Sequence, residues 1–278
     1  MTIDTPTSNW SAQQRDHLAK QFAALAVEAG AVIMQIYAED FAVRAKADGS
    51  PVSMADEQAE ALILAGLAQI APGIPVLAEE AAARGEMPRL GATFILVDPL
   101  DGTKEFVSRR GEFTVNIALV CAGVPLAGAV YAPALGQLWY GGSRAFALAI
   151  APGADMQAAI AAQPICVRQR PADGLTALAS RSHGDALTEE FLARLPVHTR
   201  IAAGSSLKFC KIAEGTADVY PRFGPTMEWD TAAGDAVLRA AGGITCDAQG
   251  QVLTYGKAKE FYRNGPFVAW GVRPLTGA

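Results

Sequence analysis

The sequence of 278 residues predicts a layered α+β fold. A long helical pattern opens the chain, strand signals dominate residues 112–149, and strands and helices then alternate towards the C-terminus. This length corresponds to one large domain or two small ones. We expect two domains, 1–150 and 151–278, because the small-residue segment that begins at Ala151 has little predicted structure of its own.

In the first half, residues 11–37 predict a helix, because apolar side chains recur there at helical spacing behind Ser11, a suitable N-cap residue. A second helix is expected to begin at Ser53. The strands expected in this half, all short and rich in apolar residues, are 41–46, 74–78, 94–97, 113–121, 127–131, 137–140 and 145–149.

In the second half, helices and strands are expected to alternate. The predicted strands are 176–180 and 217–221, and the predicted helices are 185–195, 205–214 and 230–241. Glycines close two of these helices, Gly215 after the second and Gly242 after the third.

Composition and charge exclude several classes of protein. An apolar content of 51% with 18% charged residues excludes global disorder. The net charge is −5 and no basic run is present, so a nucleic-acid partner is not expected. The four cysteines form no CxxC pair, which argues against a zinc ribbon or a disulfide framework and favours a cytoplasmic protein with reduced thiols.

Nothing in the sequence indicates secretion or a membrane span. The first residues include Asp4 and carry no basic-then-apolar signal region. The longest apolar stretch, Val115 to Ala132, is interrupted by Asn116, Gly123 and Pro125, which predicts two strands joined by a turn.

The segment Asp98-Pro99-Leu100-Asp101-Gly102-Thr103 is the most informative stretch. An apolar strand precedes it, and proline and glycine in it predict a tight turn at the end of that strand. Two carboxylates in such a turn can converge, and a hard divalent cation would relieve their repulsion. Taken alone, the segment is equally consistent with an acidic surface turn.

Three further acidic positions favour the cation site. The pair Glu79-Glu80 also follows a buried strand, Asp230 begins a predicted helix, and Asp56 lies in the first turn of another. Each position has an ordinary explanation, since Asp230 can be an N-cap and Asp56 can interact with the helix dipole. Together they predict an oxygen-ligand site for Mg²⁺ or Mn²⁺ rather than for zinc.

These motifs resemble the inositol-monophosphatase family of lithium-sensitive phosphatases. Residues 94–103 resemble the first signature of the family, and 229–234, followed by 241–243, resemble the second. Residues 77–80 match its upstream glutamate pair, and the resemblance extends from about residue 15 to the C-terminus. It implies an αβαβα sandwich of the type that inositol monophosphatase and fructose-1,6-bisphosphatase share.

Within this family, four segments resemble the bacterial 3'(2'),5'-bisphosphate nucleotidases. They are 101–106, 111–116, 204–210 and 220–226. Where inositol monophosphatases carry a glutamate that contacts the inositol ring, this sequence has Arg222. A cation at that position suits a second phosphate better than a neutral polyol.

The resemblance also implies a metal site. Glu79, Asp98 and the carbonyl of Leu100 would hold one Mg²⁺, and Asp98, Asp101 and Asp230 would hold a second. A third ion would share Glu79, Mn²⁺ could replace Mg²⁺, and Li⁺ would inhibit. Asp56 and Thr103 would activate the attacking water.

The substrate contacts that the resemblance implies are Gly102, Thr103, His183, Ser205, Lys208, Arg222 and Asp230. Ser205 is expected to begin a helix and to meet a phosphate there. Two of these residues have simpler alternatives, since His183 could lie in a surface loop and Lys208 could be an exposed helix lysine.

The function that follows from the resemblance is removal of the 3'-phosphate of adenosine 3',5'-bisphosphate, and of its sulfated 5' analogue, in sulfate assimilation. One alternative is a phosphatase of inositol or sugar phosphates. A second is a regulator on the same fold that binds nucleotide or metal without catalysis. The family contains monomers and homodimers, and some relatives are peripheral on the cytoplasmic face of the inner membrane, although this sequence supplies no amphipathic anchor.

Overall fold

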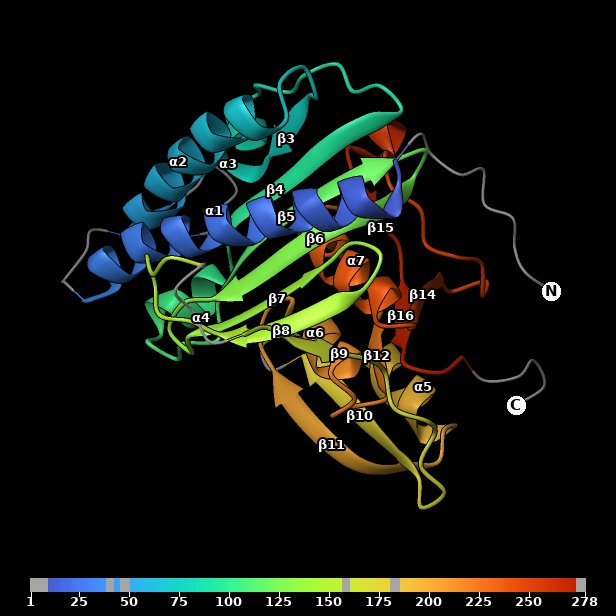
Figure 1. Cartoon of the computed structure of the whole chain (residues 1–278). Helices are drawn as coiled ribbons and strands as arrows, with labels where there is room; N and C mark the ends of the chain where they lie inside the picture. The colour runs from blue at the N-terminus through green and yellow to red at the C-terminus, as the bar shows by residue number, and fades with distance from the viewer. Residues whose placement is uncertain (1–9, 39–42, 46–50, 157–160, 181–185, 274–278) are drawn as a thin grey trace.

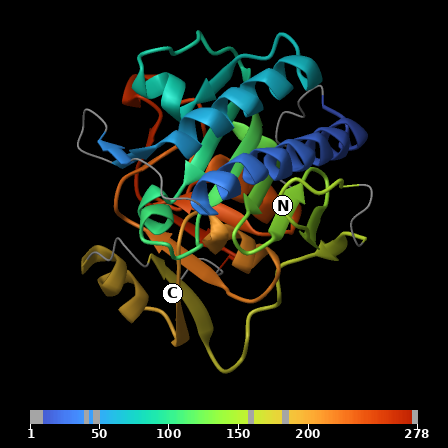
Figure 2. The same cartoon turned by 90° about the vertical axis from the view of Figure 1, so that its left-hand side faces the viewer.

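The computed structural model describes residues 10–38, 43–45, 51–156, 161–180 and 186–273. Its elements form five stacked layers, which Figures 1 and 2 show from two sides. Two helices cover a seven-stranded sheet, two more separate it from a five-stranded sheet, and a last helix lies outside that second sheet. The expected αβαβα sandwich is therefore confirmed.

The outer helical layer consists of α1 (Ala12–Ala38) and α2 (Met54–Ile70). α1 begins where the sequence predicts. The Ser11 hydroxyl accepts a hydrogen bond from the backbone N–H of Gln14 (3.2 Å), and the side chain of Gln14 accepts one from the backbone N–H of Ser11 (2.8 Å). This reciprocal pair satisfies two N–H groups at the start of the helix.

Among the described residues, α1 is the one helix that is long and apolar enough to cross a membrane by length and composition. Its side chains at Phe22, Ala26 and Ile33 are fully buried in a cluster that includes the first sheet. Burial of this apolar stripe against the sheet explains the hydropathy of α1 as that of a core helix.

The first sheet has the order β3-β4-β5-β6-β7-β8-β9. Only β3 and β4 are parallel, and the other neighbours are antiparallel. The strands, which include all those predicted between residues 113 and 149, are β3 (Val76–Ala78), β4 (Thr93–Asp101), β5 (Thr114–Cys121), β6 (Val124–Ala132), β7 (Gln137–Gly141), β8 (Ala145–Ala149) and β9 (Gln163–Ile165). The apolar stretch from Val115 to Ala132 is thus a hairpin, as expected.

Shorter elements connect these layers. β1 (Val43–Ala45) pairs with β2 (Pro51–Ser53), which leads directly into α2. The remainder of the strand predicted at 41–46 lies outside the described residues. Two one-turn helices follow strands of the first sheet, α3 (Glu79–Ala83) after β3 and α4 (Thr103–Val107) after β4.

The second sheet has the order β11-β10-β12-β16-β14. β10 is parallel to both of its neighbours, whereas β16 is antiparallel to β12 and β14, so this sheet is mixed. Its strands are β10 (Leu175–Ser180), β11 (Val197–Ala203), β12 (Val219–Arg222), β14 (Ile244–Asp247) and β16 (Phe267–Trp270). The sequence predicted two of the five.

Three helices and a small ribbon complete the second half. α5 (Ala186–Ala193) lies outside the second sheet, and α6 (Leu207–Ala213) and α7 (Ala232–Ala240) lie between the sheets. The ribbon consists of β13 (Thr226–Met227) and β15 (Arg263–Asn264), preceded by the short helix η1 (Ala258–Glu260). The division at residue 150 stays a prediction, and β9 extends the first sheet beyond it.

The middle helical layer is held against both sheets by close packing. A Cβ atom at Gly128 of β6 would lie 2.8 Å from the Ala233 carbonyl oxygen and 2.9 Å from the Ala236 Cβ, so α7 rests directly on the backbone of the strand. On the other side, the rings of Phe209 and Phe267 are stacked with their centroids 5.9 Å apart, which joins α6 to the second sheet. This packing fixes the residues at the start of α7 relative to β4.

Candidate active site

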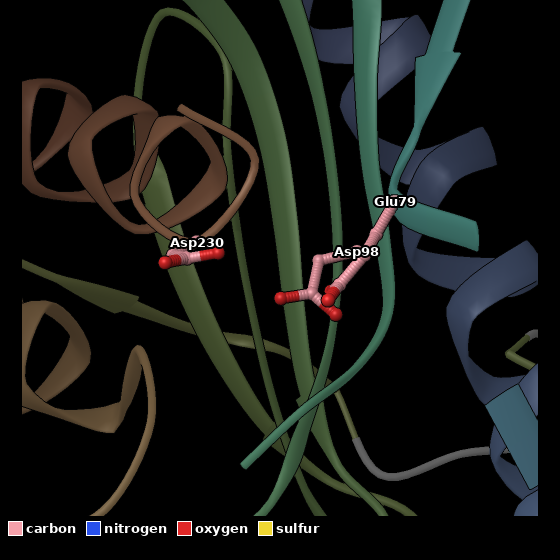
Figure 3. A group of neighbouring side chains, drawn as sticks. All are labelled: Glu79, Asp98 and Asp230. Atoms are coloured by element: carbon pink, nitrogen blue, oxygen red, sulfur yellow. The ribbon is translucent and has the colours of Figure 1, made fainter. Parts of the chain in front are cut away.

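Three carboxylates from separate elements meet between the layers (Figure 3). Glu79 is the first residue of α3, Asp98 lies in β4, and Asp230 stands two residues before α7. Each offers one oxygen, and these oxygens all lie within 4.8 Å of one another. Because the parallel strands β3 and β4 lead to the same edge of the sheet, Glu79 and Asp98 are brought together by strand pairing.

The segment that carries Asp98 and Asp101 is a bulge rather than the expected turn at a strand end. Asp98 pairs with Asn116 and Asp101 pairs with Thr114, so β4 has one extra residue and continues through the motif. Within the bulge, the Leu100 N–H donates to Asp98 Oδ1 (3.0 Å). Pairing with β5 before and after the bulge holds the two carboxylates on a rigid strand.

The bulge ends at Gly102, where the backbone has a φ of +91°. Glycine adopts this conformation readily, whereas other residues are strained in it. A Cβ atom at this position would also lie 2.3 Å from the Ser205 hydroxyl oxygen. Thr103 then begins α4, and its hydroxyl donates to the Leu100 carbonyl (3.4 Å).

A cavity of about 350 Å³ opens beside the three carboxylates. Ten of the residues that the sequence singled out line it: Glu79, Asp98, Leu100, Asp101, Gly102, Thr103, Ser205, Lys208, Arg222 and Asp230. The first and second halves of the chain both contribute to this lining. Residues more than 100 positions apart in the sequence therefore share one site.

Among the predicted site residues that the structure describes, Asp56 is not on the cavity wall. Asp56, in the first turn of α2, is only 1% exposed, and its charge contributes to the raised pKa of Asp98. Asp56 is therefore buried near the carboxylate cluster. A residue that only interacts with the helix dipole would instead be expected in solvent. His183 lies outside the described residues.

The crowding of carboxylates raises their pKa values. Burial raises the pKa of Asp98 well above its usual range, and the charges of Glu79, Asp101 and Asp230 raise it further. Burial raises the pKa of Asp101 to about 6, although the nearby Lys208 opposes this shift. Burial and the charge of Asp101 also raise the pKa of Asp230 well above its usual range. The cluster is therefore short of positive charge.

The donor set fits a hard divalent cation. The cluster offers carboxylate oxygens, and the carbonyl of Leu100 lies on the same wall. No histidine or cysteine is among the described residues that line the cavity. Oxygen-only ligands favour Mg²⁺ or Mn²⁺ over zinc.

Lys208 is a buried cation that also lines the cavity. It is 3% exposed, which excludes the alternative of an exposed helix lysine. Its ammonium group donates to the carbonyls of Ala203 (3.2 Å) and Ser205 (2.5 Å) and lies 5.1 Å from the centre of the Tyr220 ring. Burial lowers the pKa of Lys208 to about 8, against the opposing effect of Asp101.

Arg222 supplies a second buried cation. It ends β12 and is 8% exposed. Its guanidinium donates to the carbonyls of Gly224 (3.3 Å) and Pro225 (3.1 Å), and these bonds turn it towards the cavity wall. A planar guanidinium held in this way still has donors left for an anion.

Ser205 lies at the junction of the two halves and does not begin a helix as expected. α6 begins at Leu207, and Ser205 has a φ of +47°, in the left-handed region. Its hydroxyl lies 2.8 Å from the Asp101 carbonyl and 2.9 Å from the Glu112 carbonyl, to which it donates. A contact between Ser205 and a phosphate stays a prediction.

Sequence reasoning missed a polar network beneath this junction. The Ser206 hydroxyl donates to the Asn116 side-chain carbonyl (2.6 Å) and lies 2.9 Å from the Thr114 hydroxyl, and all three residues are buried. Thr114 and Asn116 are the polar residues of an otherwise apolar strand, β5. That exception to the pattern was the available signal, since buried polar groups require partners.

Most of the chain matches a known protein family. The sequence profile of the inositol monophosphatase family matches residues 14–270, and the chain belongs to this family. The curated relatives include the 3'(2'),5'-bisphosphate nucleotidase CysQ of Escherichia coli K12, which is 44% identical over 88% of this chain and 96% of its own length. The CysQ protein of Salmonella typhimurium is 43% identical over 89% of this chain and 98% of its own length.

Solved structures support the same assignment. The crystal structure of CysQ from Bacteroides thetaiotaomicron has a TM-score of 0.78 and 38% sequence identity, and the match covers 93% of this chain and 98% of that one. The inositol monophosphatase TM1415 of Thermotoga maritima has a TM-score of 0.72 at 22% identity, with 93% and 92% of the two chains covered. At that identity, the second comparison bears on the fold alone.

Proposed function

We propose that this enzyme removes the 3'-phosphate of adenosine 3',5'-bisphosphate and releases AMP and phosphate. The observation that carries the proposal is the pairing of a carboxylate cluster with two buried cations, Lys208 and Arg222, in one cavity. A substrate with two phosphates needs both features, since one phosphate reacts and the other is bound. The nucleotidase names of the curated relatives support the same substrate class.

The carboxylates would hold the metal ions. Glu79, Asp98 and the carbonyl of Leu100 would bind one Mg²⁺, and Asp98, Asp101 and Asp230 would bind a second. Bound in this way, the ions supply Lewis acidity, which lowers the pKa of water and stabilises the oxygens that enter and leave phosphorus. Mg²⁺ itself, its replacement by Mn²⁺, a third ion and inhibition by Li⁺ are all parts of the proposal.

Two residues would prepare the attacking water. Thr103 lines the cavity, with its hydroxyl proton directed to the Leu100 carbonyl, so its oxygen is free to accept a hydrogen bond from water. Asp56 is buried close enough to Asp98 for its charge to raise the pKa of Asp98. The pair orients the water for attack in line with the leaving 3'-oxygen, and no covalent phosphoenzyme is required.

The two cations would bind the 5'-phosphate. With a pKa of about 8, Lys208 is mostly protonated at neutral pH, and a phosphate dianion beside it would stabilise its charge further. The guanidinium of Arg222 can bind phosphate through two parallel hydrogen bonds. His183, Gly102 and Ser205 are additional proposed substrate contacts. We place the enzyme in the cytoplasm, in sulfate assimilation, as a monomer or homodimer.

Two other functions are less well supported. A phosphatase of inositol or sugar monophosphates would use the same carboxylates, but a neutral polyol gives no reason to bury two cations opposite them. A regulator that only binds nucleotide would need neither Thr103 nor the full set of carboxylates.

The test compares phosphate release from adenosine 3',5'-bisphosphate and from inositol 1-phosphate in the presence of Mg²⁺. We expect kcat/KM to favour the nucleotide by about 100-fold or more, which is roughly 2.7 kcal/mol of differential transition-state binding. A preference for inositol 1-phosphate would overturn the substrate and leave the metal chemistry intact. Release from neither compound would favour the regulator. Competition of Li⁺ with Mg²⁺ provides a separate check of the metal site.

A further inference from the structure

Asp230 lies in the segment of residues 226–231, which consists of β13 and the turn before α7 and is here called the Asp230 loop. The carboxylate of Asp230 is oriented from within this loop, because its Oδ2 accepts a hydrogen bond from the Met227 N–H (2.8 Å). The position of Met227 therefore decides where the carboxylate points. Contacts that hold Met227 therefore also orient Asp230.

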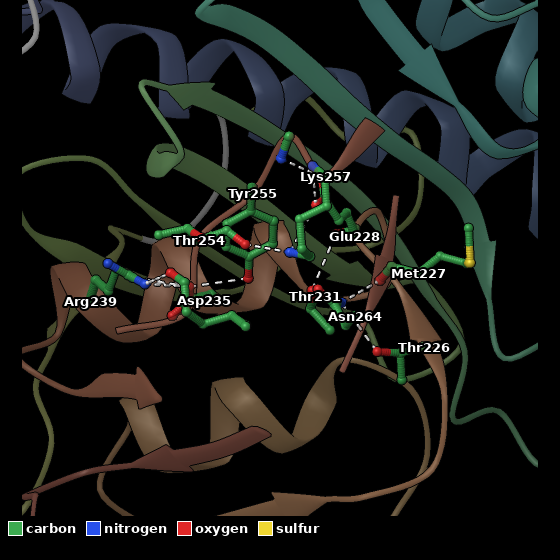
Figure 4. A network of polar contacts seen from close by, with 12 residues as sticks. Thr226, Met227, Glu228, Thr231, Asp235, Arg239, Thr254, Tyr255, Lys257 and Asn264 are labelled. Atoms are coloured by element: carbon green, nitrogen blue, oxygen red, sulfur yellow. Dashed lines mark hydrogen bonds and ion pairs between the residues drawn. The ribbon is translucent and has the colours of Figure 1, made fainter. Parts of the chain in front are cut away.

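Asn264 of β15 holds both sides of the Asp230 loop (Figure 4). Its side-chain amide donates to the Met227 carbonyl (2.9 Å) and to the Thr231 hydroxyl (3.0 Å), and it lies 3.2 Å from the Thr226 hydroxyl. Asn264 is 3% exposed, so these bonds are shielded from water. One side chain thus joins a residue before Asp230 to the residue directly after it.

The orientation of this amide follows from its partners. The Met227 carbonyl can only accept a hydrogen bond, so the NH₂ group of Asn264 must face it. With this orientation, Asn264 Oδ1 is buried and has no hydrogen-bond partner in the part of the chain that the structure describes. An unsatisfied buried oxygen costs free energy. The protein bears this cost in the orientation that directs the NH₂ group of Asn264 to the Met227 carbonyl.

Glu228 provides a second set of contacts that restrain the loop. This residue is fully buried, and its carboxylate accepts hydrogen bonds from the N–H groups of Gly256 (2.7 Å) and Lys257 (2.9 Å) and pairs with the Lys257 ammonium group (2.8 Å). Its own N–H donates to the Tyr262 carbonyl (2.8 Å). The segment from Gly256 to Asn264 therefore restrains the Asp230 loop at several points.

We infer that Asn264 is a positioning residue for Asp230, and that it sets the affinity of the carboxylate cluster for a divalent cation through Met227. Asn264 is absent from the cavity lining, so we assign it no direct contact with the substrate or the cation. The inference rests on the metal site of the proposed function but not on the identity of the substrate. Residues that orient metal ligands typically change metal affinity or activity by about 10- to 100-fold when they are replaced.

The test uses Asn264→Leu, which keeps the approximate size and removes the donor, and Asn264→Asp, which replaces the donor with an acceptor. Thr245→Val is the matched control. Thr245 is equally buried and donates to Asp235 Oδ1 (2.7 Å), beyond the Asp230 loop. Mn²⁺ affinity is measured by titration calorimetry without substrate, and the Mg²⁺ concentration for half-maximal phosphate release is measured separately.

For both Asn264 variants, we expect the Mn²⁺ dissociation constant and the half-saturating Mg²⁺ concentration to rise by about 10-fold or more. KM for the nucleotide at saturating Mg²⁺ should stay within about twofold. The control should lower the melting temperature without changing either metal constant. Should Asn264→Leu fail to fold, Asn264→Asp carries the test, with melting temperatures measured in parallel.

Unchanged metal affinity in a folded Asn264 variant would overturn the inference, and so would an equal loss of affinity in Thr245→Val. Absence of Mn²⁺ binding by the unchanged protein would overturn it together with the proposed metal site. If the protein binds Mn²⁺ in an Asn264-dependent manner and releases no phosphate from the nucleotide, the proposed function fails and the positioning role stands.

Discussion

In the proposed function, Arg222 is the residue that distinguishes a bisphosphate substrate from a monophosphate. Its guanidinium is held by the carbonyls of Gly224 and Pro225 and lines the same cavity as the carboxylates. Burial of a cation is costly unless an anion or hydrogen bonds compensate for it. Substrates with and without a second phosphate should therefore respond differently to its replacement.

We predict that Arg222→Glu raises KM for adenosine 3',5'-bisphosphate at least about 100-fold, because the substitution places a carboxylate where the second phosphate would bind. Hydrolysis of a simple phosphate monoester should fall far less. Arg170→Glu makes the same change of charge at an exposed position outside the cavity and should leave KM unchanged. Equal losses on both substrates would contradict the role of Arg222.

Gly102 is the residue at which the chain passes from the β4 bulge into α4, close to Ser205. We predict that Gly102→Ala reduces activity by about 10-fold or more and lowers the melting temperature, because the new methyl group is strained at a φ of +91° and collides with Ser205. Gly73→Ala is the control, since Gly73 has a φ of +82° with nothing within 4 Å of a Cβ atom. Similar behaviour of the two variants would show that backbone strain alone is responsible.

At the scale of elements, α7 depends on its contact with β6. We predict that Gly128→Val lowers the melting temperature by several degrees, because a side chain there must push α7 away from the strand. Since Asp230 stands only two residues before α7, Mn²⁺ affinity should fall as well. Gly91→Val, at a position with nothing within 4 Å, should do neither. Retained metal affinity in a destabilised Gly128→Val protein would uncouple α7 from the site.

The elements show what the sequence could reveal. The hairpins of residues 113–149 were predictable, because Gly and Pro mark turns between strands that are adjacent in sequence. The bulge in β4 was not, since Pro99 and Gly102 suggested a strand end and pairing with β5 overrode that local preference. β14 and β16 were missed because they pair with strands that are not their neighbours in the chain. β14 pairs with β16, and β16 also pairs with β12.

The same distinction applies to the site. The carboxylates could be predicted because they occur in compact motifs with a chemical reason for their spacing. The roles of Asn264 and Ser206 could not, since each is an ordinary polar residue until the fold places it beside Met227 or Asn116. The sequence therefore indicated the carboxylates that meet in the cavity, and the structure revealed the polar residues packed around them.

At the scale of the whole molecule, the carboxylate cluster links stability to pH and metal. The pKa of Asp101 is raised from 3.8 to about 6 in the folded protein. Between these values the folded state binds more protons than the unfolded state, so the free energy of unfolding of the metal-free protein falls as pH rises. The pKa values of Asp98 and Asp230 are also raised in the folded protein, so these two carboxyl groups contribute to the same loss.

We therefore predict that Mg²⁺ raises the melting temperature more at about pH 8 than at about pH 5, because the cation neutralises charges that exist only at the higher pH. Scanning calorimetry with Mg²⁺ or with a chelator measures the difference. Asp98→Asn removes the most crowded charge, and it should stabilise the metal-free protein at high pH, weaken the Mg²⁺ effect and abolish turnover. A Mg²⁺ effect that is independent of pH would contradict this account.

The strand orders of the two sheets also bear on the sequence of events during folding. From β4 to β9, strands that are neighbours in the first sheet are neighbours in the chain, so their pairing closes only short loops. In the second sheet, β12 pairs with β16, which lies much further along the chain, so this pairing closes a longer loop. Asp230 and its supports belong to this second half. We therefore expect the first sheet to form before the second, and the carboxylate cluster to be complete only when both sheets have formed.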